Sequence, residues 1–187
     1  MPIGIRLDGC IPCFGRLQIS TGMIQLGYNF IPPFPKRKIV LHVNGTIIFK
    51  GKCLIGNESS IYVSGNLILG DNFSATYSLK LFCFDNITFG NNCLLAWDIL
   101  CMDSSQHQLT DIYTNQHIGS KSKPIQIGEN CWIASKCLIL PGTKIANYTS
   151  VTANTTLHKD YLNYGTHKLI GDSPVRILKE DVYLKRK

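Results

Sequence analysis

The stretch IGENCWIASKCLILPGTKIANYTSVTANTTLHKD, residues 127–160, places an aliphatic residue at every sixth position. These residues are Ile127, Ile133, Ile139, Ile145, Val151 and Leu157. A period of six fits neither the 3.6-residue period of a helix nor the two-residue alternation of a strand. Four residues after each of the first five comes a smaller residue: Cys131, Cys137, Thr143, Thr149 and Thr155. The double pattern predicts an all-β solenoid of short strands joined by tight corners, with an aliphatic and a small side chain directed inward.

The period of six also appears earlier in the chain. It runs through Phe49, Ile55, Ile61 and Leu67, is lost in the segment 71–85, and returns at Phe89, Leu95 and Cys101. Between residues 103 and 124 the period disappears, and the segment is polar and carries two histidines. Because it interrupts a strongly periodic region, we predict a loop extruded from one corner, where a rigid scaffold often carries chemistry.

The two ends lack the repeat, and the 187 residues are predicted to form a single domain. Residues 1–44 are predicted to form irregular first coils or a cap over the open end of the solenoid. Residues 45–157 form the coils. Residues 158–187 are predicted to hold one strand around 168–170 and a short C-terminal helix from Pro174 onward.

Composition limits the classes of function. Apolar residues make up 44% of the chain, enough for a buried core. No apolar run reaches the roughly 18 residues of a membrane span, and no secretory leader is evident, which predicts a cytoplasmic protein. The formal charge of +7 and the basic residues 184–187 indicate either attraction to coenzyme A, a nucleotide-linked sugar or a membrane surface, or simply a solvated surface. No aromatic-and-basic motif predicts nucleic-acid binding.

The eight cysteines are not spaced as metal ligands. Four follow an aliphatic or aromatic corner residue by four positions, and these are Cys53, Cys93, Cys131 and Cys137. We predict that they fill the small inward position of the repeat as buried free thiols. Cys10 and Cys13 form a single CxxC pair without a second pair, so no metal site is predicted.

The repeat and its wording resemble the hexapeptide-repeat acyltransferases, which include many sugar O-acetyltransferases. The resemblance covers roughly residues 45–180 and rests on five short motifs. They are Ile127-Gly128, Trp132-Ile133-Ala134, Pro141-Gly142, Ala153-Asn154-Thr155 and His158-Lys159-Asp160. Within that family, residues 86–107 resemble enzymes that acetylate capsular or lipopolysaccharide sugars. The resemblance implies a left-handed parallel β-helix, although parallel crossovers are in general right-handed. It also implies a homotrimer with active sites between subunits.

Acetyl transfer to a hydroxyl needs a base, because a hydroxyl is a weak nucleophile at neutral pH. The segment Met102-Asp103-Ser104-Ser105-Gln106-His107 resembles the family's D-x-D-x-H loop, which implies that His107 is the catalytic base. Asp103 would accept a hydrogen bond from one imidazole nitrogen and fix the tautomer. His117, ten residues further on, is the alternative base.

The resemblance also implies binding residues. Backbone groups of Ala134, Ala153 and Asn154 match positions that contact the pantetheine arm of acetyl-CoA, and Lys159 and Arg176 match basic positions near its phosphates. A backbone N–H near the thioester would bind the oxyanion. Trp132 and Trp97 are expected either to line the acceptor site or to fill a subunit interface.

The function that these features favour is O-acetylation of a sugar in a bacterial surface polysaccharide, with acetyl-CoA as co-substrate and direct attack without an acyl-enzyme. One alternative is N-acetylation of a nucleotide-linked amino sugar, although no βαβ unit fits before residue 49. Another is a non-catalytic solenoid that binds partners along a flat face. The acceptor sugar, its hydroxyl, its attachment to a nucleotide, lipid or polymer, and the acyl chain are not determined by the sequence. A lipid-linked acceptor would bring the protein close to a membrane.

Overall fold

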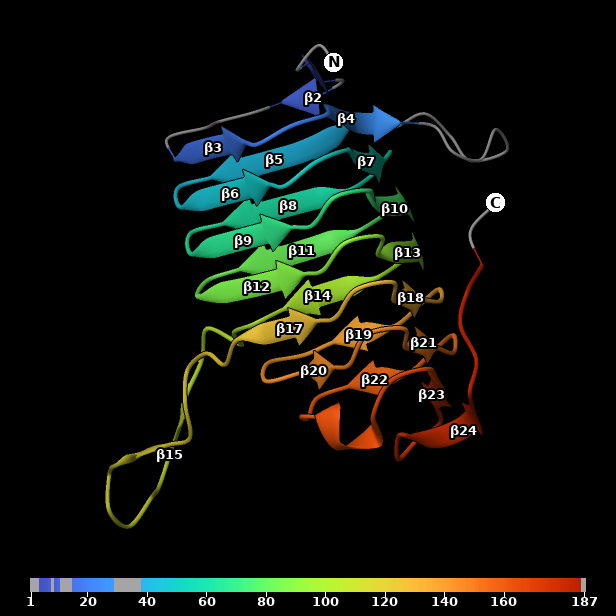
Figure 1. The fold of residues 1–187 in the computed structure, drawn as a ribbon. Coiled ribbons are helices and arrows are strands. Elements are labelled where there is room, and N and C mark those ends of the chain that lie inside the picture. Colours follow the sequence, from blue (N-terminus) through green and yellow to red (C-terminus); the bar gives the residue numbers. More distant parts are fainter. Residues whose placement is uncertain (1–3, 8, 11–14, 29–37, 186–187) are drawn as a thin grey trace.

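A computed structural model describes residues 4–7, 9–10, 15–28 and 38–185. Within these residues the chain winds as a stack of coils, each contributing one strand to each of three parallel sheets (Figure 1). Sheet A contains β1 (Gly4–Leu7), β4 (Met23–Tyr28), β7 (Cys53–Gly56), β10 (Phe73–Tyr77), β13 (Leu94–Trp97), β18 (Trp132–Ile133), β21 (Ser150–Val151), β23 (Lys168–Gly171) and β24 (Arg176–Glu180). Sheet B contains β2 (Gly9–Cys10), β5 (Ile39–Val43), β8 (Ser60–Val63), β11 (Lys80–Cys83), β14 (Leu100–Met102), β19 (Leu138–Ile139) and β22 (Thr156–Leu157). Sheet C contains β3 (Arg16–Ile19), β6 (Thr46–Phe49), β9 (Asn66–Leu69), β12 (Asn86–Phe89), β17 (Ile125–Ile127) and β20 (Lys144–Ile145).

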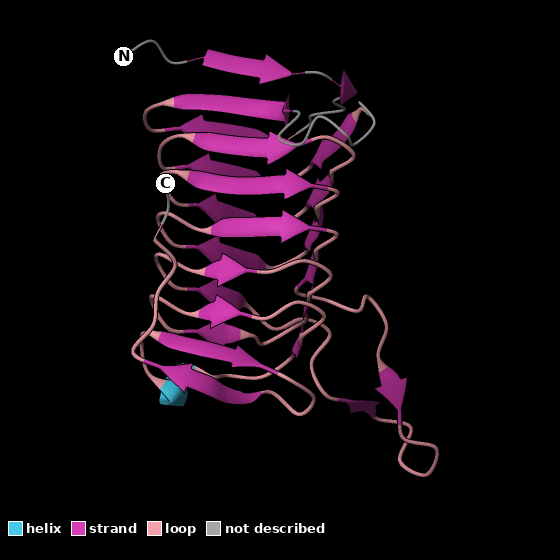
Figure 2. Ribbon diagram, turned by 90° about the vertical axis from the view of Figure 1, so that its right-hand side faces the viewer, coloured by secondary structure: helices cyan, strands magenta, loops and turns pink. Residues whose placement is uncertain are grey.

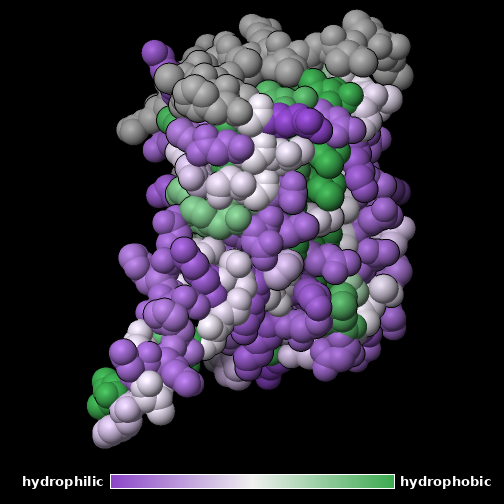
Figure 3. Space-filling view, turned by 90° about the vertical axis from the view of Figure 1, so that its left-hand side faces the viewer, coloured by the Kyte–Doolittle hydropathy of each residue, from purple (hydrophilic) through white to green (hydrophobic). Residues whose placement is uncertain are grey.

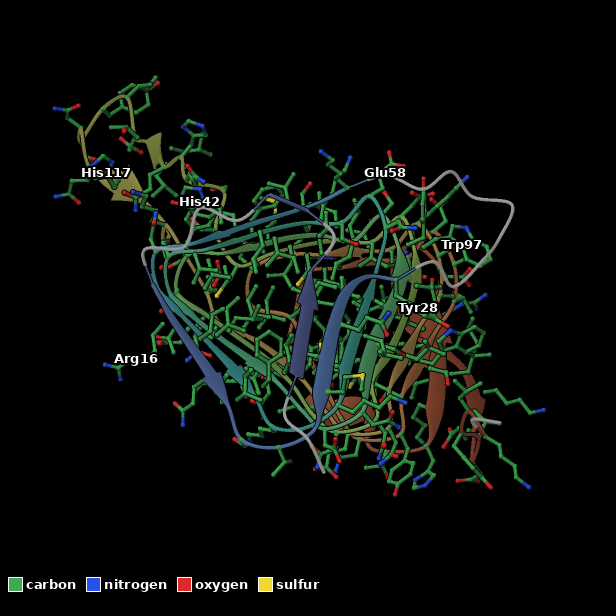
Figure 4. All side chains as sticks on the ribbon, turned by 90° about the horizontal axis from the view of Figure 1, so that it is seen from above. Arg16, Tyr28, His42, Glu58, Trp97 and His117 are labelled. Atoms are coloured by element: carbon green, nitrogen blue, oxygen red, sulfur yellow. The ribbon has the colours of Figure 1, made fainter. Side chains whose placement is uncertain are left out.

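Seen from the N-terminal end, the coils enclose a triangular prism (Figure 4). The chain passes from sheet C to sheet A to sheet B, and it turns anticlockwise as it recedes from the viewer. The coil is therefore left-handed. The prediction of an all-β, left-handed parallel β-helix is confirmed. The A/B corner joins sheet A to sheet B, and the B/C corner joins sheet B to sheet C.

The coils have two lengths. In the C-terminal coils Ile127 pairs with Ile145, a step of 18 residues, as a period of six requires. In the N-terminal coils Leu67 pairs with Ile87, a step of 20. The N-terminal strands are mostly four residues long, and each directs two side chains inward. Segment 71–85, where the period of six is lost, is therefore a regular coil, because 20 is not a multiple of six.

The inward positions form the hydrophobic core. All six aliphatic residues of the repeat in 127–157 are at most 1% exposed, and the five small residues between them are also buried. The threonines at the small position do more than save space. Thr143, Thr149 and Thr155 each donate a hydroxyl hydrogen bond of 2.7 to 2.8 Å to the carbonyl three residues earlier. Each corner therefore binds one of its own carbonyls with the side chain that fills it.

The ends of the chain differ in part from the prediction. β3 lies in sheet C beside β6, and β4 lies in sheet A beside β7, so the described residues before 44 form coils of the solenoid. The predicted strand around 168–170 is present as β23. The predicted helix from Pro174 is wrong: β24 pairs antiparallel with β23, as Figure 2 shows at the lower end of sheet A. The hairpin forms because the last coil leaves the edge of β23 open, and residues 176–180 pair with it. A 3-10 helix at Leu162–Tyr164 precedes this hairpin.

The predicted free thiols lie inside the prism. Cys53, Cys93, Cys131 and Cys137, together with Cys83 and Cys101, are free and buried, whereas the side chains of Cys10 and Cys13 lie outside the described residues. Burial raises the pKa of the Cys53 thiol. Burial, with the nearby Asp103 carboxylate, raises the pKa of Cys83 to about 12.

We predict that iodoacetamide at mildly alkaline pH leaves these six thiols unmodified in the native protein. The reacting species is the thiolate, which burial disfavours. Peptide mass spectrometry of the native protein and of protein unfolded in urea measures the difference, and every one of the six should be modified after unfolding. Modification of Cys53 or Cys83 in the native state would contradict the prediction.

Candidate functional site at the two edges of sheet B

The extruded loop leaves the B/C corner after β14. It carries a small antiparallel hairpin, β15 (Leu109–Thr110) paired with β16 (His117–Ile118), which projects well clear of the prism (Figures 1 and 2). His107 lies before β15 and its side chain is exposed. His117 lies on β16, where its Nδ1 is 3.3 Å from Thr110 Oγ1. The loop therefore presents both candidate bases to solvent, at the B/C edge of sheet B.

Asp103 ends the last regular strand before the loop. It is completely buried and continues the inward row of Val63 and Cys83. In the coil above, the N–H groups of Ser64 and Gly65 bond to the carbonyl of Cys83. At the equivalent position one coil further on, the Asp103 carboxylate accepts from the N–H groups of Phe84 at 2.8 Å and Asp85 at 2.9 Å. Its side chain thus replaces the backbone acceptor that is lost where the chain leaves the coil.

This arrangement changes the role expected for Asp103. Both carboxylate oxygens bind backbone N–H groups, and no hydrogen bond joins them to the imidazole of His107 in the described structure. The expected bond that would fix the tautomer of His107 is therefore not made. The carbonyl of Asp103 also accepts from the N–H of Lys123 at 2.9 Å. Asp103 holds the two ends of the loop together and positions the loop on the scaffold.

Ser104 completes the closure of the loop. It is 1% exposed, and its hydroxyl donates to the carbonyl of Lys121 at 2.8 Å and accepts from the N–H of Gln106 at 3.0 Å. Gln106 has φ of 59°, in the left-handed region that non-glycine residues seldom adopt. The Ser104 hydroxyl thus stabilises the bend from which His107 leaves the scaffold. Sequence reasoning missed Ser104, because a serine in a polar loop carries no signal until its burial is known.

The residues implied to contact coenzyme A lie at the opposite edge. Ala134, Ala153 and Asn154 follow β18 and β21 at the A/B corner, and Asn154 has φ of 60°. The N–H groups of Ser135 and Ala153 have no hydrogen-bond partner within the described part of the chain. Two free backbone donors beside small side chains fit an amide-bearing chain such as pantetheine, and either could bind an oxyanion.

The two basic residues implied for the coenzyme phosphates are separated. Arg176 pairs with Gly171 at the A/B end of β23, and its Nε lies 2.7 Å from Asp172 Oδ2. Lys159 follows β22 and therefore lies at the B/C corner, on the other side of sheet B. Arg176 thus belongs with the A/B group, whereas the structure does not bring Lys159 to it. Lys136, at the same corner as Ala134, is a nearer cation that sequence reasoning missed.

The tryptophans belong to the A/B side. Trp97 ends β13, and its carbonyl accepts from the N–H of Lys136 at 3.0 Å. Trp132 lies on the outer face of sheet A between Leu94 and Ser150. Figure 4 places Trp97 and His117 on opposite sides of the prism. Along sheet B, the roughly five residues from one corner to the other span about 15 Å. One chain therefore carries the candidate base at one edge of sheet B and the corner of small residues at the other edge.

No helix among the described residues is long and apolar enough to cross a membrane. No group of three or more His, Cys, Asp or Glu side chains in residues 4–7, 9–10, 15–28 and 38–185 could hold a metal ion.

Comparison with known proteins identifies acetyltransferases as relatives of this chain. No family model matches the chain. WcaF of Escherichia coli K12, assigned as an acetyltransferase of colanic acid biosynthesis, is 31% identical over 124 residues, 66% of this chain and 64% of WcaF. The galactoside O-acetyltransferase of the same organism is 27% identical over 167 residues, 88% of this chain and 78% of that enzyme. These relatives bear out the resemblance to the hexapeptide-repeat acyltransferases.

Another curated relative and two solved structures agree with this resemblance. A protein of Dictyostelium discoideum assigned as an acetyltransferase is 28% identical over 115 residues, 62% of this chain. The matched segments span 58% of that protein and 64% of WcaF, less than two thirds of their lengths. Two solved structures share the fold: the polysialic-acid-specific acetyltransferase NeuO, at 18% identity and TM-score 0.61, and the polysialic acid O-acetyltransferase OatWY, at 17% and 0.55. This chain aligns over 98% of its length with both, covering 89% of NeuO and 92% of OatWY.

We predict that Asp103→Ala destabilises the fold, because the N–H groups of Phe84 and Asp85 lose their acceptor. Each buried unpaired group costs about 1–3 kcal/mol. Urea unfolding measures the loss, and amide hydrogen exchange at residues 84 and 85 should become faster. Asp103→Asn keeps one acceptor oxygen, so its free energy of unfolding should lie between those of the wild type and Asp103→Ala.

Asp111→Asn is the matched control for this prediction. Asp111 also accepts two backbone N–H groups, those of Tyr113 and Thr114, and these bonds lower the pKa of its carboxyl, but it lies at the solvated loop tip. The Asp111→Asn variant should leave the free energy of unfolding nearly unchanged. Equal effects of Asp103→Ala and Asp111→Asn would refute the role of Asp103.

Proposed function

We propose that this chain transfers an acetyl group from acetyl-CoA to a hydroxyl of a sugar in a bacterial surface polysaccharide. The observation that carries the proposal is the pairing, on one regular prism, of a rigidly held histidine loop with a corner of small residues and free N–H donors. The activities assigned to WcaF and to the galactoside O-acetyltransferase support a sugar acceptor.

In the proposed reaction, His107 takes the proton of the acceptor hydroxyl as its oxygen attacks the thioester carbonyl. The N–H of Ser135 or of Ala153 binds the resulting oxyanion. The C–S bond then breaks, the acetyl ester forms, and the imidazolium returns its proton to the departing thiolate. No acyl-enzyme is required, and the buried thiols inside the prism take no part.

The proposed assembly is a homotrimer in which each active site joins two chains. The two half-sites of one chain face different edges of sheet B, so a ring of copies brings the loop of one chain to the A/B corner of the next. The loop tip supports contact with a neighbour, since four large apolar side chains there are more than half exposed: Leu109, Ile112, Tyr113 and Ile118. Figure 3, which faces the B/C edge, shows a small hydrophobic group at the end of the otherwise mostly polar projecting loop.

We predict that His107→Ala binds acetyl-CoA as the wild type does but loses acetyl-CoA hydrolysis and transfer. Removing a general base typically lowers the rate by about 10²–10⁴. Calorimetry measures binding, and release of the coenzyme thiol measures turnover. His117→Ala is the matched control and should keep activity. Unchanged turnover in His107→Ala would move the base elsewhere, and no binding in either protein would favour a non-catalytic solenoid.

A second prediction tests the shared site. His107→Ala and Ala153→Trp, each inactive alone, should regain activity when they are co-expressed, because a chain with an intact loop can meet a chain with an intact corner. Random mixing gives such a pair at about a quarter of the sites of a cyclic oligomer. Thiol-release activity of the purified mixed oligomer measures it. Mixed oligomers without activity would show that each site lies within one chain.

A further inference from the structure

A shallow hollow lies at the base of the loop, beside the residue that precedes His107. It has a volume of about 280 Å³. Its lining residues come from three adjacent turns at the B/C corner: Ser64, Phe84, Ser104, Gln106, Lys121 and Ser122. Pockets that enclose drug-sized ligands measure roughly 300–1,000 Å³, so this hollow matches one small ring rather than an extended molecule.

One wall of the hollow is aromatic. His42, Tyr62 and Phe84 form a column up the prism, with ring centroids 5.1 and 5.2 Å apart. Phe84 ends this column and lines the hollow. A half-buried aromatic ring at the edge of a polar hollow offers an apolar surface to the C–H face of a sugar ring, while hydroxyl groups reach the polar lining.

The polar wall carries one positive charge. Lys121 is exposed and makes no ion pair within the described part of the chain. No carboxylate lines the hollow. The carboxylate of Asp85 accepts a hydrogen bond from the Ser122 hydroxyl, with Oδ2 and Oγ 3.4 Å apart. The Ser104 hydroxyl is already occupied and the Ser122 hydroxyl donates to Asp85, which leaves the side chains of Ser64 and Gln106 as hydrogen-bonding groups for a ligand.

We propose that this hollow is the acceptor subsite and that it takes a pyranose bearing a carboxylate, with the ring against Phe84 and the carboxylate on Lys121. The inference rests on the proposed function, because the hollow gains its meaning from His107 next to Gln106. A single ammonium suits a singly charged carboxylate. A phosphate dianion would call for further cations or backbone N–H groups, which the lining does not offer.

The test compares binding of methyl β-D-glucuronide, methyl β-D-glucoside and glucose 6-phosphate by calorimetric titration and saturation-transfer NMR. These probes differ mainly in the group attached to C5, which is a carboxylate, a hydroxymethyl group or a phosphorylated hydroxymethyl group. Wild type should bind the glucuronide about tenfold more tightly than the glucoside, a difference of about 1.4 kcal/mol. Lys121→Ala should abolish this ratio, and Lys121→Arg should keep most of it.

Lys123→Ala is the matched control. It also removes one lysine charge, but the Lys123 side chain lies two residues further along the chain and does not line the hollow. It should keep the preference for the glucuronide. Equal binding of the glucuronide and the glucoside by wild type, a preference that survives in Lys121→Ala, tighter binding of glucose 6-phosphate, or no binding of any probe would each overturn the proposal. Acetyl-CoA binding, measured on the same samples, separates failure of the subsite proposal from failure of the proposed function. If the protein still binds acetyl-CoA, only the subsite proposal is refuted.

Discussion

Every coil of this protein depends on the next one for its hydrogen bonds. In a parallel solenoid the N–H and C=O groups of each strand are paired by the coils above and below. This requirement fixes the register over the whole stack, because a slip of one residue would turn the aliphatic side chains outward and the polar ones inward. It also explains the small inward residues, since threonines and cysteines at the corners both fit the narrow space and donate to corner carbonyls.

The same requirement governs the one place where the stack is interrupted. Where the chain leaves the B/C corner, two N–H groups of the preceding corner would lose their acceptor. The Asp103 carboxylate takes that place, and Ser104 closes the two ends of the loop. A 20-residue excursion is thereby attached to the scaffold at a fixed point, which a base acting on a bound sugar requires. Stability and the proposed chemistry meet in these two adjacent residues.

The division of the site between two edges follows from the geometry of the prism. Its corners are separated by the width of a sheet, so the proposed site needs the loop of one chain and the A/B corner of a neighbouring chain. The regular coils hold these edges in place, whereas the loop supplies the candidate bases His107 and His117. The hollow beside Phe84 lies where the loop joins the coils, so the proposed acceptor subsite could change without disturbing the core.

The sequence by itself determined the architecture and the positions of the candidate base and of the coenzyme-type corner. The period of six in 127–157 predicts which side chains point inward, and the loss of that period between residues 103 and 124 predicts the loop. It could not reveal the 20-residue coils, whose length is not a multiple of six, nor the strand β24, which forms only because β23 offers an open edge.

Only the tertiary structure decided what the site residues touch. The role of Asp103 depends on two N–H groups that lie 18 and 19 residues earlier in the chain. The separation of Lys159 from Arg176, and the meeting of Phe84 with Lys121, likewise depend on which corner each residue reaches. Such contacts join residues distant in sequence through the stacking of coils, and a one-dimensional pattern records only the direction of a side chain, not its partner.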